Sequence, residues 1–458
     1  MTGRGCDTVL VGRRVVTPQG ERPAAVAVQG GRIVAVTRVD RAPAARRTVH
    51  LAEDEVLLPG LVDSHVHLQD PGRTDWEDVA SASRAAALGG VTTLVDMPLD
   101  SDPVTVDVAS VHAKQTALAG RSQVDYGLWG GAVPQSLGRL DGLVAAGVLG
   151  FKCFLSPTGI AGFDPLTPAQ LRSALQELRP LGVPLLVHAE DETAALPLRG
   201  PTPRYDDYLA SRPSRVEENA VAHVVAAVAA TGGWAHLVHL SAAGSLPLVR
   251  AGRDGGGRLT AETAPHYLVL PGQIADGATA AKAMPAVRLA ADAEGLWNAL
   301  RDATVDLVVS DHSPCAPGGK SGRDFAAAAP GAASLQVGLP VLWTEAMRRG
   351  HDLPQLVRWM CSAPADLAGL PRKGRVAAGA DADFCVFAPD EQLTVGPVAH
   401  KQPGTPYDGR RLVGVVRQTW LRGEPLDGRR PRGRLLPRSH ARAAALGSVA
   451  RCSRADPA

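Results

Sequence analysis

The chain has 458 residues, of which 45% are hydrophobic and 21% are charged. This composition is that of an ordinary globular protein and excludes a chain that is disordered throughout. Lys and Arg number 48 against 46 Asp and Glu, so a net charge of +2 does not indicate a nucleic-acid-binding protein. The apolar runs are far shorter than the ~20 residues of a membrane span, and no signal-peptide pattern stands at the N-terminus, so we expect a cytoplasmic protein without a membrane partner.

Both ends of the chain have the texture of β-structure. Residues 1–56 alternate apolar and polar side chains in short runs, punctuated by Gly-Gly and Pro-Gln-Gly, which is typical of antiparallel strands with tight turns. A similar texture returns in residues 373–430. These two segments predict a small β-sandwich domain built from both chain ends. Residues 431–458 form a basic, Arg- and Ala-rich tail that we expect to be disordered.

Residues 57–372 have a different sequence pattern, in which apolar β-branched runs alternate with Ala- and Leu-rich stretches of helical length. The first such stretch opens with Thr74-x-x-Glu77, the pattern of a helix capping box, and closes on Gly89 and Gly90. Eight strands separated by helices predict an α/β fold of the (β/α)₈ TIM-barrel type, since a doubly wound sheet rarely has eight in this order. The expected strands are residues 58–67, 90–98, 123–130, 147–155, 183–191, 236–241, 259–270 and 305–313.

Histidines stand at the ends of three expected strands, where the site of a (β/α)₈ barrel lies. His65 and His67 are two residues apart, so both face the same side of the first strand, where two imidazoles suit zinc, iron, cobalt or manganese. Asp63 shares that face, further from the strand end. His188 ends the fifth strand and His239 the sixth. One such histidine is more often a core residue, but two in the same barrel favour metal ligands.

Two further polar residues interrupt or end apolar strands. Lys152 lies within the fourth strand, and a buried ammonium is costly unless it is paired or neutralised. Either a neighbouring acid neutralises it, or desolvation lowers its pKa and the free amine reacts with CO₂ to give a carbamate that can bridge two metals. Asp311 ends the eighth strand and can ligate a metal, act as general base, or do both. Its neighbour His312 should point the opposite way, and we do not count it, His266 or His400 as ligands.

Taken together, these motifs resemble those of a known family. The chain carries, in the order seen in the cyclic amidohydrolases of the amidohydrolase superfamily, the segments PGLVDSHVHL, GFKCF, LLVHAE, HLVHLS, ETAPHYL and SDHSPC. Within that family, several sequence segments of this chain resemble those of the allantoinase branch: HVHLQDPGRTDWED, GGVTTLVDMPL, DYLASRP and HKQPGTPYDG. The resemblance covers about residues 7–428.

The resemblance implies a barrel with two divalent metal ions, zinc first, with cobalt, manganese or iron as alternatives. His65, His67 and Asp311 would hold one ion, His188 and His239 the other, and a carboxylated Lys152 and a hydroxide would bridge them. The implied reaction is the hydrolytic opening of the allantoin ring to allantoate. In it the hydroxide attacks the ring amide carbonyl and Asp311 carries its proton to the departing nitrogen. Relatives commonly form homotetramers, which we carry over as an expectation.

The alternatives are a hydantoinase or dihydropyrimidinase, a dihydroorotase, and a non-enzymatic relative on the same fold. Dihydroorotases hold a substrate carboxylate with an Arg and an Asn at positions occupied here by Gln69 and Leu99, which supply no cation. Hydantoinases usually place a Tyr donor where this chain has Pro157. A neutral substrate with a ureido arm suits the chain better, since Gln69 and Ser313 could hydrogen-bond that arm, although Ser313 could equally be a helix cap. A non-enzymatic relative would be expected to have lost metal ligands.

Overall fold

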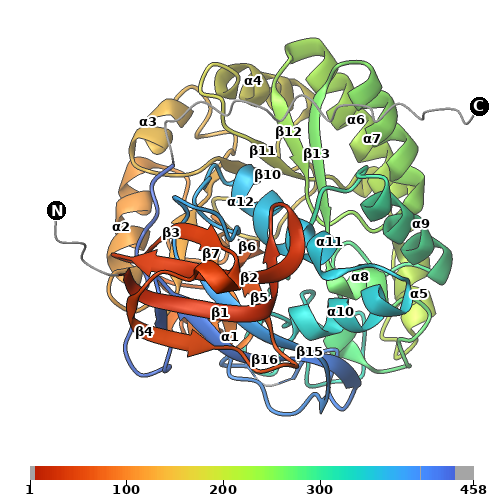
Figure 1. Ribbon diagram of the computed structural model, residues 1–458. Coiled ribbons are helices and arrows are strands. Elements are labelled where there is room, and N and C mark those ends of the chain that lie inside the picture. Colours follow the sequence, from red (N-terminus) through yellow and green to blue (C-terminus); the bar gives the residue numbers. More distant parts are fainter. Residues whose placement is uncertain (1–5, 403, 439–458) are drawn as a thin grey trace, which may run out of the picture.

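The computed structural model describes residues 6–402 and 404–438. Strands from both chain ends lie side by side in a β domain, and the middle of the chain forms a barrel with helices around it (Figure 1). No helix in the described part of the chain is long and apolar enough to cross a bilayer. The expected combination of a TIM-like barrel and a β-sandwich from the chain ends is confirmed.

The β domain follows the hydrogen-bonded order β17-β16-β15-β5-β1-β2-β3, with β4 paired to β1. Its first three strands pair antiparallel, as expected, but β4 and β5 run parallel to β1. Antiparallel pairing of β5 with β15 joins the two chain ends. The strands are β1 (Cys6–Thr17), β2 (Gly20–Gln29), β3 (Arg32–Thr37), β4 (Ala45–His50), β5 (Val56–Pro59), β15 (Phe384–Thr394), β16 (Arg411–Leu421) and β17 (Glu424–Pro425).

The barrel strands are all parallel, and β8 and β9 together make the third of the eight. The ring closes between its last and first strands, where His67 N–H donates to the carbonyl of His312 at 2.9 Å. The strands are β6 (Leu61–Val66), β7 (Val91–Asp96), β8 (Asp125–Leu128), β9 (Gly130–Gly131), β10 (Phe151–Phe154), β11 (Leu185–His188), β12 (Trp234–Leu237), β13 (Arg258–Thr263) and β14 (Leu307–Val308).

Helices follow most barrel strands and pack outside them (Figure 1). They are α1 (Val79–Leu88), α2 (Val108–Leu118), α3 (Leu140–Ala145), α4 (Pro168–Leu178), α5 (Tyr205–Ser211), α6 (Arg215–Thr231), α7 (Leu246–Asp254), α8 (Pro265–Val269), α9 (Ala290–Arg301), α10 (Gly338–Arg348), α11 (Leu353–Val357) and α12 (Ala363–Leu367). Short 3₁₀ turns span Val39–Arg41, Glu192–Ala194, Ala243–Ser245 and Thr279–Ala281, and a π-helical turn spans Arg358–Ser362.

Two predicted element boundaries are wrong. The strand expected over residues 259–270 ends at Thr263, because Pro265 takes the first position of α8, where a proline needs no amide donor. Helix α1 is capped by Asp78, which accepts from Ser81 N–H at 2.8 Å, and not by Thr74. The predicted partner Glu77 is fully buried and instead accepts from the backbone N–H of Lys401.

Part of the basic tail is ordered, contrary to the expectation of disorder from residue 431. Tyr126 N–H donates to the carbonyl of Arg434 at 2.9 Å, and Leu436 N–H donates to the carbonyl of Tyr126 at 2.7 Å. Pairing between β9 and β10 begins only at Gly130, so this stretch of the chain supplies the partner that the backbone of Tyr126 lacks there. We call residues 431–438 the C-terminal strap. Residues 439–458 lie outside the described residues.

Candidate metal centre

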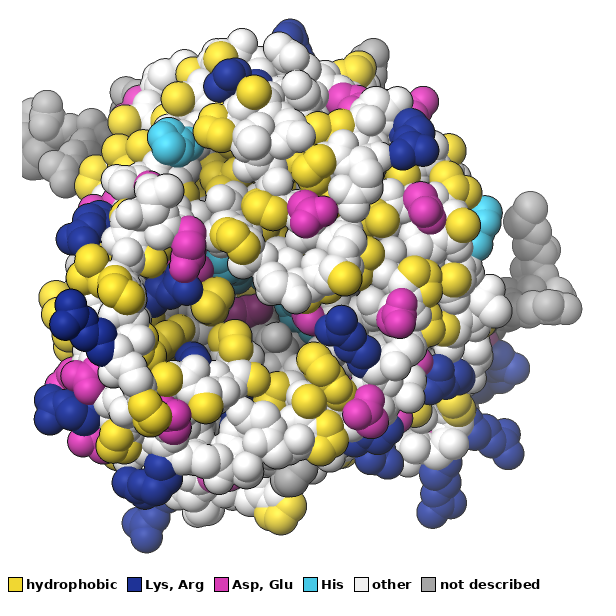
Figure 2. Space-filling view, turned by 180° about the vertical axis from the view of Figure 1, so that it is seen from behind, with side chains coloured by type: hydrophobic (Ala, Val, Ile, Leu, Met, Phe, Trp, Pro, Cys, Tyr) yellow, Lys and Arg dark blue, Asp and Glu magenta, His cyan; other side chains and the backbone are white. Residues whose placement is uncertain are grey.

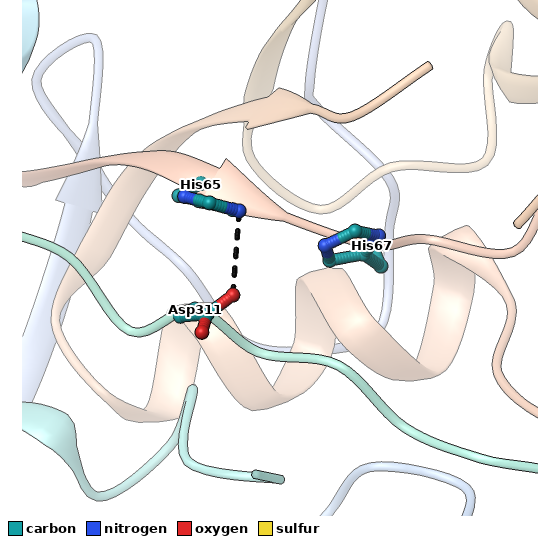
Figure 3. A group of neighbouring side chains, drawn as sticks. All are labelled: His65, His67 and Asp311. Atoms are coloured by element: carbon teal, nitrogen blue, oxygen red, sulfur yellow. Dashed lines mark ion pairs between the residues drawn. The ribbon is translucent and has the colours of Figure 1, made fainter. Parts of the chain in front are cut away.

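Three side chains meet at the carboxyl ends of the first and last barrel strands (Figure 3). His65 lies on β6, His67 follows it, and Asp311 comes three residues after β14. One donor atom from each lies within 4.8 Å of the other two, and His65 Nε2 is 3.3 Å from Asp311 Oδ1. All three are buried. Two imidazoles and a carboxylate at this spacing form a metal site, because these donors suit a divalent transition metal.

The other two expected histidines lie beside this group. His188 ends β11, and His239 comes two residues after β12. His188 Nδ1 and His239 Nε2 face each other at 3.0 Å, and both side chains are buried. The ring of His239 lies 5.5 Å from that of His65 between centroids. The four histidines predicted from strand ends are therefore neighbours in space, with a second pair of ring nitrogens that one ion could share.

Lys152 lies on β10 and is 1% exposed. Burial lowers the pKa of its ammonium to about 8, against the opposing charges of Glu262 and Asp311. Its Nζ lies 5.0 Å from the centre of the Phe154 ring, and within the described residues it has no carboxylate at ion-pair distance. A free amine is accordingly accessible at neutral pH, which is the form that reacts with CO₂.

The backbone turns sharply where two of these side chains project. His239 has φ +39° and Asp311 has φ +48°, a region that side-chain-bearing residues enter at a cost of about 1–3 kcal/mol. Burial raises the pKa of the Asp311 carboxyl to about 7, while the nearby His67 and Lys152 lower it. His312 points away, as predicted, with its Nε2 3.7 Å from Glu77. Backbone strain of this kind is typical of functional sites, where a side chain must point in one particular direction.

Three buried or nearly buried carboxylates stand behind the imidazoles, and the sequence analysis did not single them out. Each lies close to one ring nitrogen and leaves the other free for a metal. The hydrogen bonds of Glu262 to His65 and of Glu190 to His188 fix the tautomer and the ring orientation, whereas Asp100 approaches His67 Nδ1 without a hydrogen bond. Glu190 and Glu262 lie within the segments LLVHAE and ETAPHYL, and Asp100 directly follows GGVTTLVDMPL, so acids at strand ends were the signal that could have found them. They are Glu262 at His65 Nδ1, Asp100 at His67 Nδ1 (2.9 Å) and Glu190 at His188 Nε2 (2.8 Å).

Other polar residues near the strand ends have partners within the protein. His236 contacts Thr260 Oγ1 at 2.8 Å and Glu262 Oε2 at 3.0 Å, so its ring nitrogens are taken by the protein, whereas His239 faces His188. Asp63 accepts from the backbone N–H of His65 and Ser310, which ties β6 to the end of β14.

The predicted substrate contacts are less clearly placed. Gln69 is 1% exposed and its amide nitrogen donates to the carbonyl of Pro314 at 3.2 Å, while its Oε1 has no partner among the described residues. Ser313 is half-buried and caps no helix, since the next helix, α10, begins only at Gly338. Figure 2 shows a hollow on the face opposite to that of Figure 1, with acidic and histidine side chains at its floor. Substrate contact by these two residues stays a prediction.

The model of the amidohydrolase family matches residues 56–425. Allantoinase of Streptomyces avermitilis is 49% identical over 94% of this chain and 99% of its own length. Allantoinases of Arabidopsis thaliana and Escherichia coli are 40% and 36% identical, over 90% and 91% of this chain and 86% and 94% of their own lengths. The chain belongs to the allantoinase group of the amidohydrolase family.

Solved structures of other members share the fold of this amidohydrolase. The L-hydantoinase (dihydropyrimidinase) of Arthrobacter aurescens superposes with a TM-score of 0.88 at 27% identity, covering 94% of this chain and all of that one. The dihydropyrimidinase of Brevibacillus agri gives 0.83 at 26% identity, covering 94% and 98%. The sequence is thus closer to allantoinases than to the cyclic amidohydrolases whose structures it matches.

Proposed function

We propose that this protein is an allantoinase, which hydrolyses the ring amide of allantoin to give allantoate. The 49% identity to an allantoinase over nearly the full length of both chains carries this proposal. The buried group of His65, His67 and Asp311 supplies the chemistry that hydrolysis of an amide requires. A non-enzymatic relative is disfavoured because every position expected to ligate a metal is occupied by a suitable side chain.

The proposed cofactor is a pair of divalent ions, zinc first, with cobalt, manganese and iron as alternatives. When bound, the metals would polarise the ring carbonyl and supply an activated water at neutral pH. The lowered pKa and the burial of Lys152 support its carboxylation, and its carbamate would be shared by both ions. The proposed ligands are His65, His67 and Asp311 for one ion, His188 and His239 for the other, and carboxylated Lys152 for both.

The chain's own residues orient the reactants and move the proton. Asp311 would take the proton of the attacking water and deliver it to the departing ring nitrogen. Glu262 and Glu190 hydrogen-bond His65 and His188 and hold each imidazole in one tautomer, so these donor atoms are oriented before substrate binds. Gln69 and Ser313 are the proposed contacts to the ureido arm of allantoin.

The runner-up is a hydantoinase or dihydropyrimidinase, which the structural neighbours favour. Pro157 weakens this alternative because it cannot supply the hydroxyl donor that such enzymes usually carry at that position. Leu99 and Gln69 weaken a dihydroorotase, because a substrate carboxylate left without a cation would be costly to bind.

A ring-opening assay with allantoin, hydantoin, dihydrouracil and dihydroorotate tests the proposal on the metal-loaded protein. We expect kcat/KM for allantoin to exceed that for dihydroorotate by at least ~10²-fold, since unpaired buried polar groups cost about 1–3 kcal/mol each and charged ones more. Comparable turnover of dihydroorotate, or no turnover of allantoin with the metals bound, would contradict it. The homotetrameric assembly and the cytoplasmic location stay predictions, and light scattering of the purified protein checks the first.

A further inference from the structure

His266 is a buried histidine that the chemistry described above does not use. It is 1% exposed, and neither of its ring nitrogens has a hydrogen-bond partner within the described part of the chain. Other buried histidines there, such as His312, His351 and His400, lack a partner at one ring nitrogen only. Buried polar groups are nearly always paired, so an imidazole with two unpaired nitrogens needs an explanation.

The surroundings of His266 hold its ring in one place. It lies in the first turn of α8, directly after the carboxyl end of β13. Its ring packs on that of Tyr267, with centroids 4.1 Å apart, and the Tyr267 hydroxyl donates to the carbonyl of Pro285 at 2.9 Å. The backbone carbonyl of His266 accepts from Leu270 N–H. The position of the imidazole ring is therefore set by its packing on Tyr267 and by the backbone of α8, and not by a hydrogen bond to the ring.

The polar side chain that this ring approaches is Asp311. His266 Nε2 lies 3.8 Å from Asp311 Oδ2, while Oδ1 of the same carboxylate faces His65 at 3.3 Å. The two carboxylate oxygens are thus divided, one toward the metal ligands and one toward His266. A separation of 3.8 Å is longer than a hydrogen bond, but contacts of catalytic groups are often long before substrate binds and shorten in the reacting complex.

We propose that His266 is a positioning residue that donates from Nε2–H to Asp311 Oδ2 and holds this carboxylate in the direction needed for proton delivery. A neutral imidazole carries one N–H and can make this bond without adding charge to the site. Misplacement of a proton-transfer group by about 1 Å can cost 10²-fold in rate. The role rests on the proposed ring-opening reaction, in which Asp311 carries the proton to the departing nitrogen.

The variants His266→Phe and His266→Leu remove both nitrogens, and the smaller Leu covers the case in which Phe does not fit. We expect kcat to fall about 10- to 100-fold, while KM stays within about 3-fold and the metal content per chain is unchanged, because the substrate and metal contacts remain. His266→Gln restores an amide donor and should recover at least about 5-fold of the lost kcat. Recovery by a donor separates positioning from packing.

His351→Leu is the matched control, since His351 is also buried, has an unpaired Nε2 and stacks on Trp297 away from the metal site. This variant should lower Tm and leave kcat unchanged. The proposal is overturned if the Phe and Leu variants keep kcat within about 3-fold of the parent. It is also overturned if their kcat falls only because they lose metal, and the Gln variant does not regain that metal. If the metal-loaded parent opens hydantoin but not allantoin, the proposed substrate is wrong, whereas the role of His266 is still open to test. The kcat values of the His266 variants are then compared with hydantoin as substrate.

Discussion

Lys152 shows at the scale of one residue how burial prepares a chemical group. Its ammonium lies on β10 without a paired carboxylate in the described chain, and burial lowers its pKa to about 8. If it carries the carbamate, Lys152→Ala should lose metal and ring-opening activity together, because a ligand common to both ions is removed. Elemental analysis and an allantoin assay measure this. A short carboxylic acid added to the variant should restore part of the rate, and a variant with two metals and a near-normal rate would exclude the carbamate.

Asp311 combines two roles that one substitution can separate. Asp311→Asn keeps an oxygen that can still touch a metal but cannot accept a proton, so metal content should fall only in part. We expect kcat to drop by at least ~10²-fold, the usual effect of losing a general base. Metal analysis measures the metal content of the variant, and steady-state kinetics measures its kcat. If activity returns fully when metal is added back, Asp311 is a ligand alone.

The C-terminal strap shows what a short element contributes to the barrel. Arg438 donates to the carbonyls of Leu149 at 2.6 Å and Gly182 at 3.0 Å, which precede β10 and β11. Arg438→Ala should destabilise the fold by about 1–3 kcal/mol, because the carbonyls of the buried Leu149 and the partly buried Gly182 lose a charged donor. Calorimetry should show a Tm lower by about 1–3 °C, since the unfolding entropy grows with chain length.

Arg434→Ala is the control for this effect. The side chain of Arg434 is exposed, and the strap contacts of this residue come from its backbone. The Tm of the Arg434→Ala variant should therefore match that of the parent. Equal Tm values for both variants would mean that the side-chain contacts of Arg438 add nothing to stability.

At the scale of the whole molecule, the proposed metal ligands join five barrel strands that are far apart in the sequence. Removing the metals with a chelator should abolish ring opening and also lower Tm, since ligand binding at 1,000 times Kd stabilises a fold by about 4 kcal/mol. Scanning calorimetry before and after dialysis against dipicolinate measures the shift, and added Zn²⁺ should restore both properties. A chelated protein with an unchanged rate would rule out metal-dependent hydrolysis.

The local pattern of the sequence predicted much of this arrangement. The period of two placed His65 and His67 on one face, and the strand ends pointed to His188, His239 and Asp311, because side-chain direction along a strand depends only on neighbouring residues. The same local rules failed at element ends, where Pro265 began α8 and Asp78 replaced Thr74 as the cap.

Contacts across the barrel could be decided only by the tertiary structure. The carboxylate of Glu262 meets His65 across 197 positions of the chain, His266 approaches Asp311, and Leu435 lies beside Tyr126. No spacing in the sequence encodes these pairs, since they depend on the register and closure of the eight strands. The sequence by itself determined the elements, the faces of their side chains and the chemistry available at the strand ends. The closed barrel decided that Glu262 orients His65, because only packing brings such distant residues within hydrogen-bond reach.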